Sequence, residues 1–298
     1  MTKQHLGLIY ILISQICWGL APKTISLLSP AIPATMVVFI RFMLTSILLF
    51  PLIFLRKSTR KAFFALTKKQ LISLICLGFL GSGFTDALFV TGVRYTGSIL
   101  GMVLARLEIP LTVLMAVFLL KEKINKTVII ALCLSFSGVI MMSIRNGFSS
   151  TYSDQFILGI LAALTAALLW AFATIYVKLI LNMKIPPIII VAIRLLVGSI
   201  SNLVITLATV KDATFRFISI SNTDWVKLAF LGIFASALSY YFFYKGLAAV
   251  EAQKAAILLS GAMVIALFVG VATGEILTLF QWIGVLSIFS AILIVSRK

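Results

Sequence analysis

The sequence predicts an all-α integral membrane protein with ten transmembrane helices arranged as two inverted five-helix repeats. Composition points to the membrane, because 62% of the 298 residues are hydrophobic and 11% are charged, with a mean hydropathy of +1.18, whereas about 25% of a soluble domain is charged. The long apolar runs lack the alternation typical of strands, which favours helices over an outer-membrane barrel. A third observation, an internal repeat, predicts the two halves.

Charges, prolines and glycine clusters divide the chain into candidate spans of roughly 20 residues, the length that crosses a bilayer as a helix. A polar segment, 145–155, separates two groups of five and is expected to be an extracytoplasmic linker. The first repeat, residues 1–144, contains spans 6–27, 33–55, 70–91, 98–120 and 127–144. The second repeat, residues 156–298, contains spans 156–181, 186–209, 225–245, 255–273 and 280–296.

The positions of Lys and Arg predict the orientation, because short loops that stay in the cytoplasm are enriched in these residues. With the N-terminus inside, most of the 25 Lys and Arg residues fall on the cytoplasmic side, including six between Arg56 and Lys69. We therefore expect a multi-pass protein of the cytoplasmic or inner membrane with both termini in the cytoplasm. The net charge of +17 lies in short loops rather than on one folded face, so it predicts topology and no nucleic-acid partner.

The two halves of the sequence resemble each other at an offset of 152 to 154 residues. The stretch from Gly7 to Trp18 matches that from Gly159 to Trp170, and Pro33 with Arg41 matches Pro186 with Arg194. Because five is an odd number, the second unit must enter the membrane from the opposite side. Inverted repeats of this kind are typical of secondary transporters, in which two similar units of opposite orientation support alternating access.

This pattern resembles the EamA-like branch of the drug/metabolite transporter superfamily over nearly the whole chain. The residues that carry the resemblance in the first half are Gly7, Trp18, Arg41, Pro110, Glu122 and Gly138, and those in the second half are Gly159, Trp170, Arg194 and Glu275. Met263 and Val264 stand where a second proline is common, so the two equivalent helices need not bend alike. The resemblance implies small metabolites, often amino acids or their relatives, moving through a central cavity.

Ionisable residues inside spans are costly and usually face a cavity or a partner, so they are candidate site residues. Arg41 lies eight residues beyond Pro33, about 12 Å along a helix, and Arg194 is its counterpart on the other side of the midplane. The two guanidinium groups could grip a substrate carboxylate in alternate states. Alternatively, each could bind helix ends or backbone carbonyls within its own repeat.

The predicted fourth span contains a second group of candidates. Arg106 and Glu108 are two residues apart, about 200° around a helix, so they should not both face one neighbour, and one is expected to face the cavity. Pro110 can kink the span and free a carbonyl. Asp86 is a candidate partner for Arg106 or a proton-carrying acid. Asp86 and Glu108 could each form a structural ion pair or act as a functional acid, and the sequence does not distinguish these roles.

Charge and aromatic residues predict the kind of solute. The predicted spans contain four basic residues and two acidic ones, and this positive surplus favours zwitterions or anions over cations. Lys23, one of the four, could extend its ammonium group to the membrane surface instead. Trp18 and Trp170 occupy equivalent places and could stack on substrate or pack between repeats. The aromatic run 240–244 covers all faces of its helix, partly as an interfacial belt, and Tyr241 is the candidate substrate contact within it.

The expected function is secondary transport of small polar metabolites, especially amino acids or amino-acid-derived zwitterions, by alternating access. The sole histidine, His5, lies in the N-terminal tail and no phosphate-binding loop is present, so we expect no metal, cofactor or ATP-driven step. The driving force would be the substrate gradient, a proton or a counter-substrate, and the chain would act as a monomer or homodimer. Alternatives are export of cationic drugs, carriage of organic or nucleotide-type anions, a passive channel, and an intramembrane acid-dependent enzyme.

Overall fold

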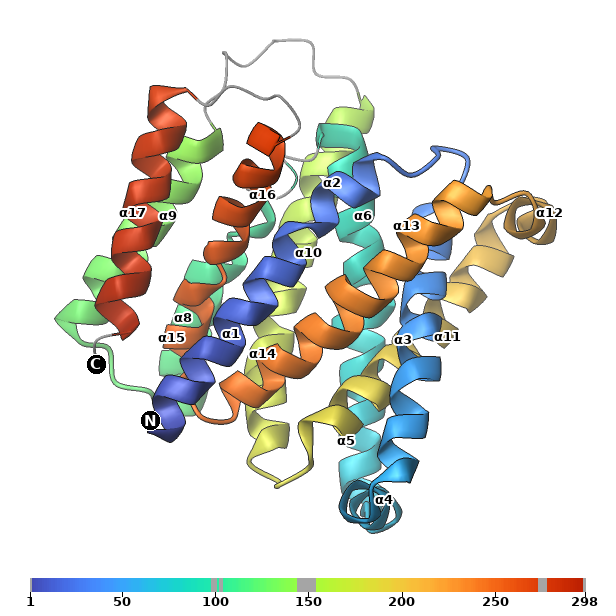
Figure 1. Cartoon of the computed structure of the whole chain (residues 1–298), viewed down its shortest axis with the longest axis horizontal. Coiled ribbons are helices and arrows are strands. Elements are labelled where there is room, and N and C mark those ends of the chain that lie inside the picture. The colour runs from blue at the N-terminus through green and yellow to red at the C-terminus, as the bar shows by residue number, and fades with distance from the viewer. Residues whose placement is uncertain (1, 98–100, 102–103, 144–153, 273–277, 297–298) are drawn as a thin grey trace.

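The computed structural model describes residues 2–97, 101, 104–143, 154–272 and 278–296, and all regular structure within them is helical (Figure 1). Seven helical segments are long and apolar enough to cross a membrane: Lys3–Ser26, Ala34–Leu55, Lys68–Thr96, Asp154–Leu181, Pro187–Thr209, Asn222–Leu247 and Ala252–Ala272. Three shorter apolar helices, Glu108–Leu120, Lys126–Met141 and Leu279–Val295, occupy the other predicted spans. The chain is therefore a multi-pass helical protein, and the count of ten crossings stays a prediction.

The first half contains α1 (Lys3–Gly19), α2 (Ala21–Ser26), α3 (Ala34–Leu55), α4 (Lys57–Phe64), α5 (Lys68–Gly78), η1 (Phe79–Gly83), α6 (Thr85–Thr96), α8 (Glu108–Leu120) and α9 (Lys126–Ser143). The second half contains α10 (Asp154–Leu181), α11 (Pro187–Thr209), α12 (Ala213–Ile218), α13 (Asn222–Gly232), η2 (Ile233–Leu238), α14 (Ser239–Leu247), α15 (Ala252–Leu258), α16 (Gly261–Ala272) and α17 (Leu279–Ser296). Most of the predicted linker, 145–155, lies outside the described residues, as does Glu275.

Local sequence signals explain where several helices begin. Thr67 and Gln70 form a capping box at the start of α5, and the Ser221 side chain accepts a hydrogen bond from the Asp224 backbone N–H at the start of α13. Pro187 occupies the first turn of α11, where its missing N–H removes no helical hydrogen bond. These three helices therefore start at residues suited to a helix N-terminus.

Two short helices, α4 and α12, were not expected, because their residues were assigned to loops. They occupy equivalent places, after the second and seventh predicted spans, and both are seen end-on in Figure 1, at opposite ends of the molecule. No residue of α4 is buried. Because these helices have eight and six residues, they are too short to cross a bilayer and lie across the ends of the bundle.

Each half contains a π-turn at the same place in its third predicted span. The first, η1, follows Gly78, and the second, η2, follows Gly232, 154 residues later. A π-turn inserts an extra residue into the helix and disturbs the regular backbone hydrogen bonds, and such turns often lie at functional sites. The internal repeat thus extends to an irregular feature that hydrophobic patterning does not predict.

The fourth and ninth predicted spans are also interrupted at equivalent positions. Turns at residues 106–107 and 259–260 separate the helical segments on either side of them. The backbone at both turns forms i to i−3 hydrogen bonds, such as Ile109 N to Arg106 O at 2.9 Å and Met263 N to Ser260 O at 3.0 Å. The predicted bend therefore lies one turn before Pro110, because a proline ring excludes the carbonyl four residues upstream. The second break occurs without a proline, beside Gly261, so both helices are interrupted.

Contacts between the halves build much of the core. The first helix of each half packs against the end of the third helix of the other half, α1 against α14 and α10 against α6, while α3 packs on α11 and α9 on α17. At the first of these crossings Gly246 allows very close approach, since a Cβ there would lie 2.5 Å from the Gly7 carbonyl oxygen. The two halves are thus interleaved, and each covers apolar surface of the other.

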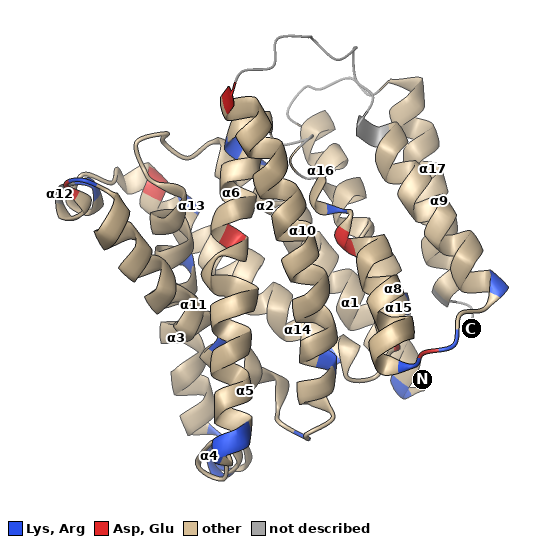
Figure 2. Ribbon diagram, turned by 180° about the vertical axis from the view of Figure 1, so that it is seen from behind, with Lys and Arg blue, Asp and Glu red and all other residues tan. Residues whose placement is uncertain are grey.

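The chain ends and the charged residues mark the two ends of the bundle. The N- and C-termini lie at the same end as α4, and α12 lies at the other (Figures 1 and 2). At the terminal end the Glu122 carboxylate accepts hydrogen bonds from the Ala252 and Gln253 backbone N–H groups, at 2.8 and 3.1 Å. Glu122 therefore caps α15, where an acid is favourable to the helix dipole.

Candidate functional site

A cavity lies at the contact between the two halves, beside both the π-turn η2 and the two helix breaks. It offers about 70 Å³ to the centres of water molecules, which is room for several waters or a small organic group. Its polar walls are formed by Arg41, Asp86, Arg106, Glu108, Thr174 and Arg194, and its aromatic walls by Trp18, Phe89, Trp170, Tyr240, Phe243 and Tyr244. Both halves contribute to each group.

Seven of the eight predicted site residues line this cavity: Trp18, Arg41, Asp86, Arg106, Glu108, Trp170 and Arg194. The eighth, Tyr241, does not, and instead lies near Phe242 and the Lys245 ammonium group. Its neighbours Tyr240 and Tyr244 line the cavity in its place. Successive side chains on a helix point about 100° apart, so five consecutive aromatic residues cover every face of the helix. The sequence therefore does not indicate which of them points into the cavity. Lys23 is also absent from the lining.

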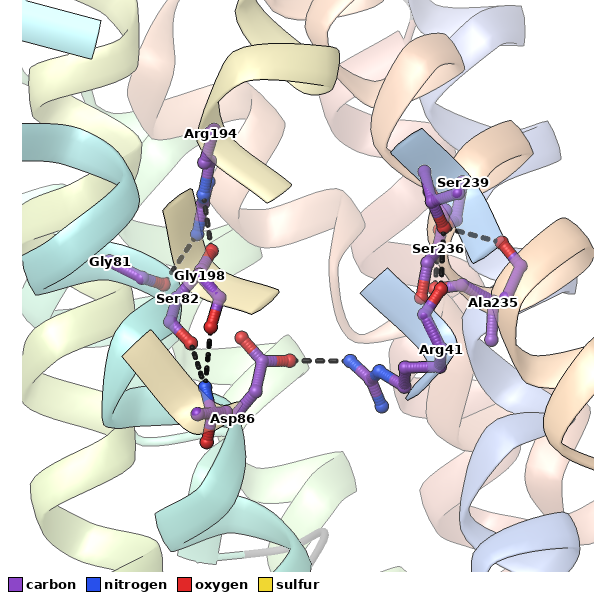
Figure 3. Close-up of polar contacts among 12 residues, drawn as sticks. Arg41, Gly81, Ser82, Asp86, Arg194, Gly198, Ala235, Ser236 and Ser239 are labelled. Atoms are coloured by element: carbon purple, nitrogen blue, oxygen red, sulfur yellow. Dashed lines mark hydrogen bonds and ion pairs between the residues drawn. The ribbon is translucent and has the colours of Figure 1, made fainter. Parts of the chain in front are cut away.

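Asp86 pairs with Arg41, not with Arg106 as expected. Arg41 Nη2 lies 2.5 Å from Asp86 Oδ1, and the two side chains are 5% and 1% exposed (Figure 3). The Trp170 indole and the Tyr240 hydroxyl are close enough to interact with the Asp86 carboxylate. Even so, Asp86 Oδ2, Arg41 Nε and Trp170 Nε1 make no hydrogen bond of good geometry. The pair is therefore buried but incompletely hydrogen-bonded.

Arg194 is held by the first half of the chain. Its Nε donates to Ser82 Oγ at 2.7 Å and its Nη2 donates to the Gly81 carbonyl at 2.6 Å (Figure 3). Its Nη1 donates to the Tyr244 hydroxyl. The guanidinium also lies 4.9 Å from the centre of the Tyr240 ring, within cation–π range. Arg194 thus binds a backbone carbonyl, as the alternative interpretation of the sequence expected. However, Gly81 and Ser82 belong to the opposite repeat and not to the repeat that contains Arg194.

Arg106 and Glu108 both line the cavity, contrary to the expectation that only one would. That expectation assumed a continuous helix, and the break at 106–107 removes the regular rotation between the two positions. Arg106 Nη1 donates to the Leu259 carbonyl at 3.2 Å, and Glu108 Oε1 accepts from Thr174 Oγ1 at 3.3 Å. Leu259 lies in the equivalent break of the second half, so Arg106 binds a carbonyl of that irregular turn.

The aromatic side chains form two equivalent clusters. Trp18 contacts the rings of Tyr240 and Phe243, with centroids 5.3 and 5.1 Å apart, and Trp170 contacts Phe89 at 5.0 Å. Phe89 and Phe243 are themselves equivalent in the repeat. They were not predicted as site residues, although their repeat match was a signal that could have found them. Each tryptophan therefore packs on aromatic residues while one side faces the cavity.

The lining carries a surplus of one positive charge, since three arginines face two acids and all five are at most 7% exposed. The unpartnered Arg106 Nε adds a further free donor. No cluster of His, Cys, Asp and Glu suited to a metal occurs in the described part of the chain. The cavity thus offers donors, carboxylates and aromatic faces to a small polar solute.

A multi-pass helical chain whose halves interleave around a small charged cavity is typical of membrane transporters. The particular family is shown by comparison: the chain belongs to the EamA-like transporter family, whose model matches residues 5–144 and again 157–297. The family comprises transporters rather than enzymes, and its members are membrane proteins that act on small molecules. The two matches correspond to the two halves of the fold.

Curated relatives agree with this assignment, and a solved structure agrees with the fold. The "Uncharacterized transporter YyaM" of Bacillus subtilis (strain 168) is 24% identical over 94% of this chain and 88% of its own, and the "Uncharacterized transporter YetK" of the same organism is 26% identical over 87% and 77%. A crystal structure whose title names no function has a TM-score of 0.76 with 15% identity, covering 98% of this chain and 95% of its own. That likeness supports the fold.

Proposed function

We propose that the protein is a secondary transporter of small polar metabolites that bear a carboxylate, foremost amino acids or amino-acid-derived zwitterions. The observation that carries this proposal is the cavity between the halves, with three buried arginines, two buried acids and a surplus of one positive charge. A cation would meet net repulsion there. A zwitterion can satisfy groups of both signs.

The unpartnered atoms suggest how such a solute binds. Arg41 Nε and Arg106 Nε are free donors for a carboxylate, whereas Asp86 Oδ2 is a free acceptor for an ammonium group. Each side-chain nitrogen of Arg194 already donates a hydrogen bond within the protein, so it serves the scaffold in this conformation. Trp18 and Trp170 offer aromatic faces to the remainder of the solute.

Alternating access between inverted repeats is the proposed mechanism. The α1 helix and its equivalent α10 run in opposite directions along the bundle (Figure 1), and each packs on the third helix of the other half. If the two repeats exchanged conformations, a cavity open to one side of the membrane would open to the other. Asp86 or Glu108 would carry a coupling proton, or a counter-substrate would drive the return step.

Counterflow in proteoliposomes tests this function. Vesicles preloaded with a mixture of unlabelled amino acids should accumulate a labelled zwitterion through the wild-type protein. Arg106→Gln should reduce the initial rate about tenfold or more, the factor for losing a hydrogen bond between charged groups. Arg94→Gln is the matched control, because Arg94 also has a buried unpartnered nitrogen but is not part of the cavity lining, and it should retain transport.

Each outcome has a defined meaning. If the wild type accumulates only cations, the zwitterion is the wrong substrate class although the protein is still a carrier. If flux shows no acceleration by substrate on the far side, the protein is a channel. If amino acids, organic anions and cations all fail to exchange through correctly inserted protein, the transport proposal is wrong for these solutes.

A further inference from the structure

Arg41 and Arg194 have equivalent backbone positions relative to the π-turn of the opposite repeat. A Cβ on Gly78, just before η1, would lie 2.8 Å from the Arg194 carbonyl oxygen. A Cβ on Gly232, just before η2, would lie 3.0 Å from the Arg41 carbonyl oxygen. Each arginine therefore starts from the same place beside a π-turn.

The side chains nevertheless go to different partners. Arg194 docks on η1 through the Gly81 carbonyl and the Ser82 hydroxyl. Arg41 turns away from η2 and pairs with Asp86 (Figure 3). The repeat is symmetric in the backbone here and asymmetric in the hydrogen bonds.

The site on η2 that corresponds to the one holding Arg194 is present and has free hydrogen-bonding capacity. Ala235 and Ser236 are the equivalents of Gly81 and Ser82. Ser236 is completely buried and its Oγ has no hydrogen-bond partner, which is unfavourable for a hydroxyl. The Ala235 carbonyl accepts from Ser239 Oγ at 2.7 Å, and a carbonyl oxygen can accept more than one hydrogen bond.

We propose that the Ala235 carbonyl and the Ser236 hydroxyl form a second docking site for Arg41, occupied in the other conformation of the transport cycle. Asp86 holds Arg41 away from this site in the conformation described. The inference rests on the proposed function, because it requires two conformations related by exchange of the repeats. In the second conformation Arg41 docks on η2 and Arg194 leaves η1.

The sequence difference between the repeats explains which arginine is docked now. The position equivalent to Asp86 in the second half is Tyr240, which carries no charge to draw Arg194 from its π-turn. Of these two arginines, Arg41 is the one that forms an ion pair with an acid among the described residues. Ser236 is thus a positioning residue that acts through Arg41.

Thiol labelling from the two sides of the membrane tests the proposal. Ala21, which lines the cavity, is replaced by Cys in a chain whose Cys17, Cys76 and Cys133 are replaced by Ala. A charged, membrane-impermeant methanethiosulfonate is applied to right-side-out and inside-out vesicles. The ratio of the two labelling rates reports how often the cavity opens to each side.

Ser82→Ala and Asp86→Asn should shift this ratio in one direction, because both remove contacts of the described conformation. Ser236→Ala should shift it in the opposite direction by about tenfold, the factor for one hydrogen bond to a charged group. Ser135→Ala is the matched control, since Ser135 Oγ is likewise buried and unpartnered, and it should leave the ratio unchanged. In an Arg41→Gln background, Ser236→Ala should have no further effect.

The inference is overturned if Ser236→Ala shifts the ratio in the same direction as Ser82→Ala, leaves it unchanged, or acts equally without Arg41. Those results leave alternating access intact, because the wild-type cavity is then still labelled from both sides. If Ala21→Cys reacts from one side only in every variant, with and without an amino-acid mixture, alternating access fails and this inference fails with it. Melting temperatures in detergent identify variants that are merely unstable.

Discussion

At the scale of single residues, the Arg41–Asp86 pair is buried without full hydrogen bonding. Removing two charges from water costs several kcal/mol per ion, and the mutual attraction offsets this only when the remaining polar atoms are also satisfied. Here Arg41 Nε and Asp86 Oδ2 are unpartnered. Such a pair stabilises one conformation weakly enough to be exchanged for other partners, which suits a transport cycle.

Glu108→Gln tests the electrostatics of the cavity. The substitution raises the surplus of positive charge in the lining by one while keeping an oxygen that can accept from Thr174. We expect the KM for a zwitterion in counterflow to rise about tenfold, because an ammonium group loses a charged acceptor, and monocarboxylates without an amine to compete better. Thr174→Val, which removes the hydrogen bond but no charge, should have the smaller effect.

The prediction is contradicted if the Glu108→Gln variant discriminates between zwitterions and monocarboxylates as the wild type does. Glu108 would then be a structural acid that offsets Arg106, and the ammonium site would have to be assigned to Asp86 alone.

At the scale of elements, close packing at the π-turns requires glycine. The Cβ of an alanine at position 78 would lie 2.6 Å from Val197 Cβ and 2.8 Å from the Arg194 carbonyl oxygen. Both are too close, and the second is backbone that cannot move alone. The glycine-rich stretch that starts at Gly78 therefore packs two helices together at the point where Arg194 docks.

Gly78→Ala and Gly261→Ala should have opposite effects on stability. We expect Gly78→Ala to destabilise the fold by about 1–3 kcal/mol through overpacking. An alanine Cβ at Gly261 would meet its nearest neighbour at 3.5 Å, an ordinary contact, and alanine gains up to about 1 kcal/mol in helix propensity. Apparent melting temperatures of purified protein in one detergent measure the difference, and equal values for the two variants would contradict the packing argument.

At the scale of the whole molecule, charge distinguishes the two ends. The α4 end carries Arg56, Lys57, Arg60 and Lys61 within six residues, whereas the α12 segment carries Lys211 and Arg216 with Asp212 between them. The termini lie at the α4 end (Figures 1 and 2). The rule that basic loops stay inside then predicts that α4 and both termini lie in the cytoplasm.

Single cysteines at equivalent exposed positions test this orientation. In intact cells an impermeant maleimide should label Thr214→Cys on α12 directly and Ser58→Cys on α4 only after permeabilisation. The background again lacks Cys17, Cys76 and Cys133. Labelling of Ser58→Cys alone in intact cells would reverse the proposed topology.

Much of this molecule could be predicted from the sequence, because a bilayer imposes a simple rule. Backbone groups in hydrocarbon must be satisfied within a helix, so apolar length predicts the seven helices that are long enough to cross a membrane. The cost of burying charge predicts that Arg41, Asp86, Arg106, Glu108 and Arg194 share a cavity, and all of them line it. The repeat, read from matched positions such as Trp18 and Trp170, agrees with the two family matches.

Which groups pair within that cavity was decided only by the tertiary structure. Asp86 binds Arg41, Arg194 binds the opposite repeat, and Arg106 and Glu108 both face inward because their helix breaks between them. These outcomes depend on irregular backbone, the π-turns and the paired breaks, whose geometry is set by close packing between halves. The sequence by itself determined the long apolar helices, the repeat and the five charged residues that line the cavity, since hydropathy and sequence matches are read residue by residue. The partners of those charges are not local, because they lie on segments from 45 to 153 residues away along the chain.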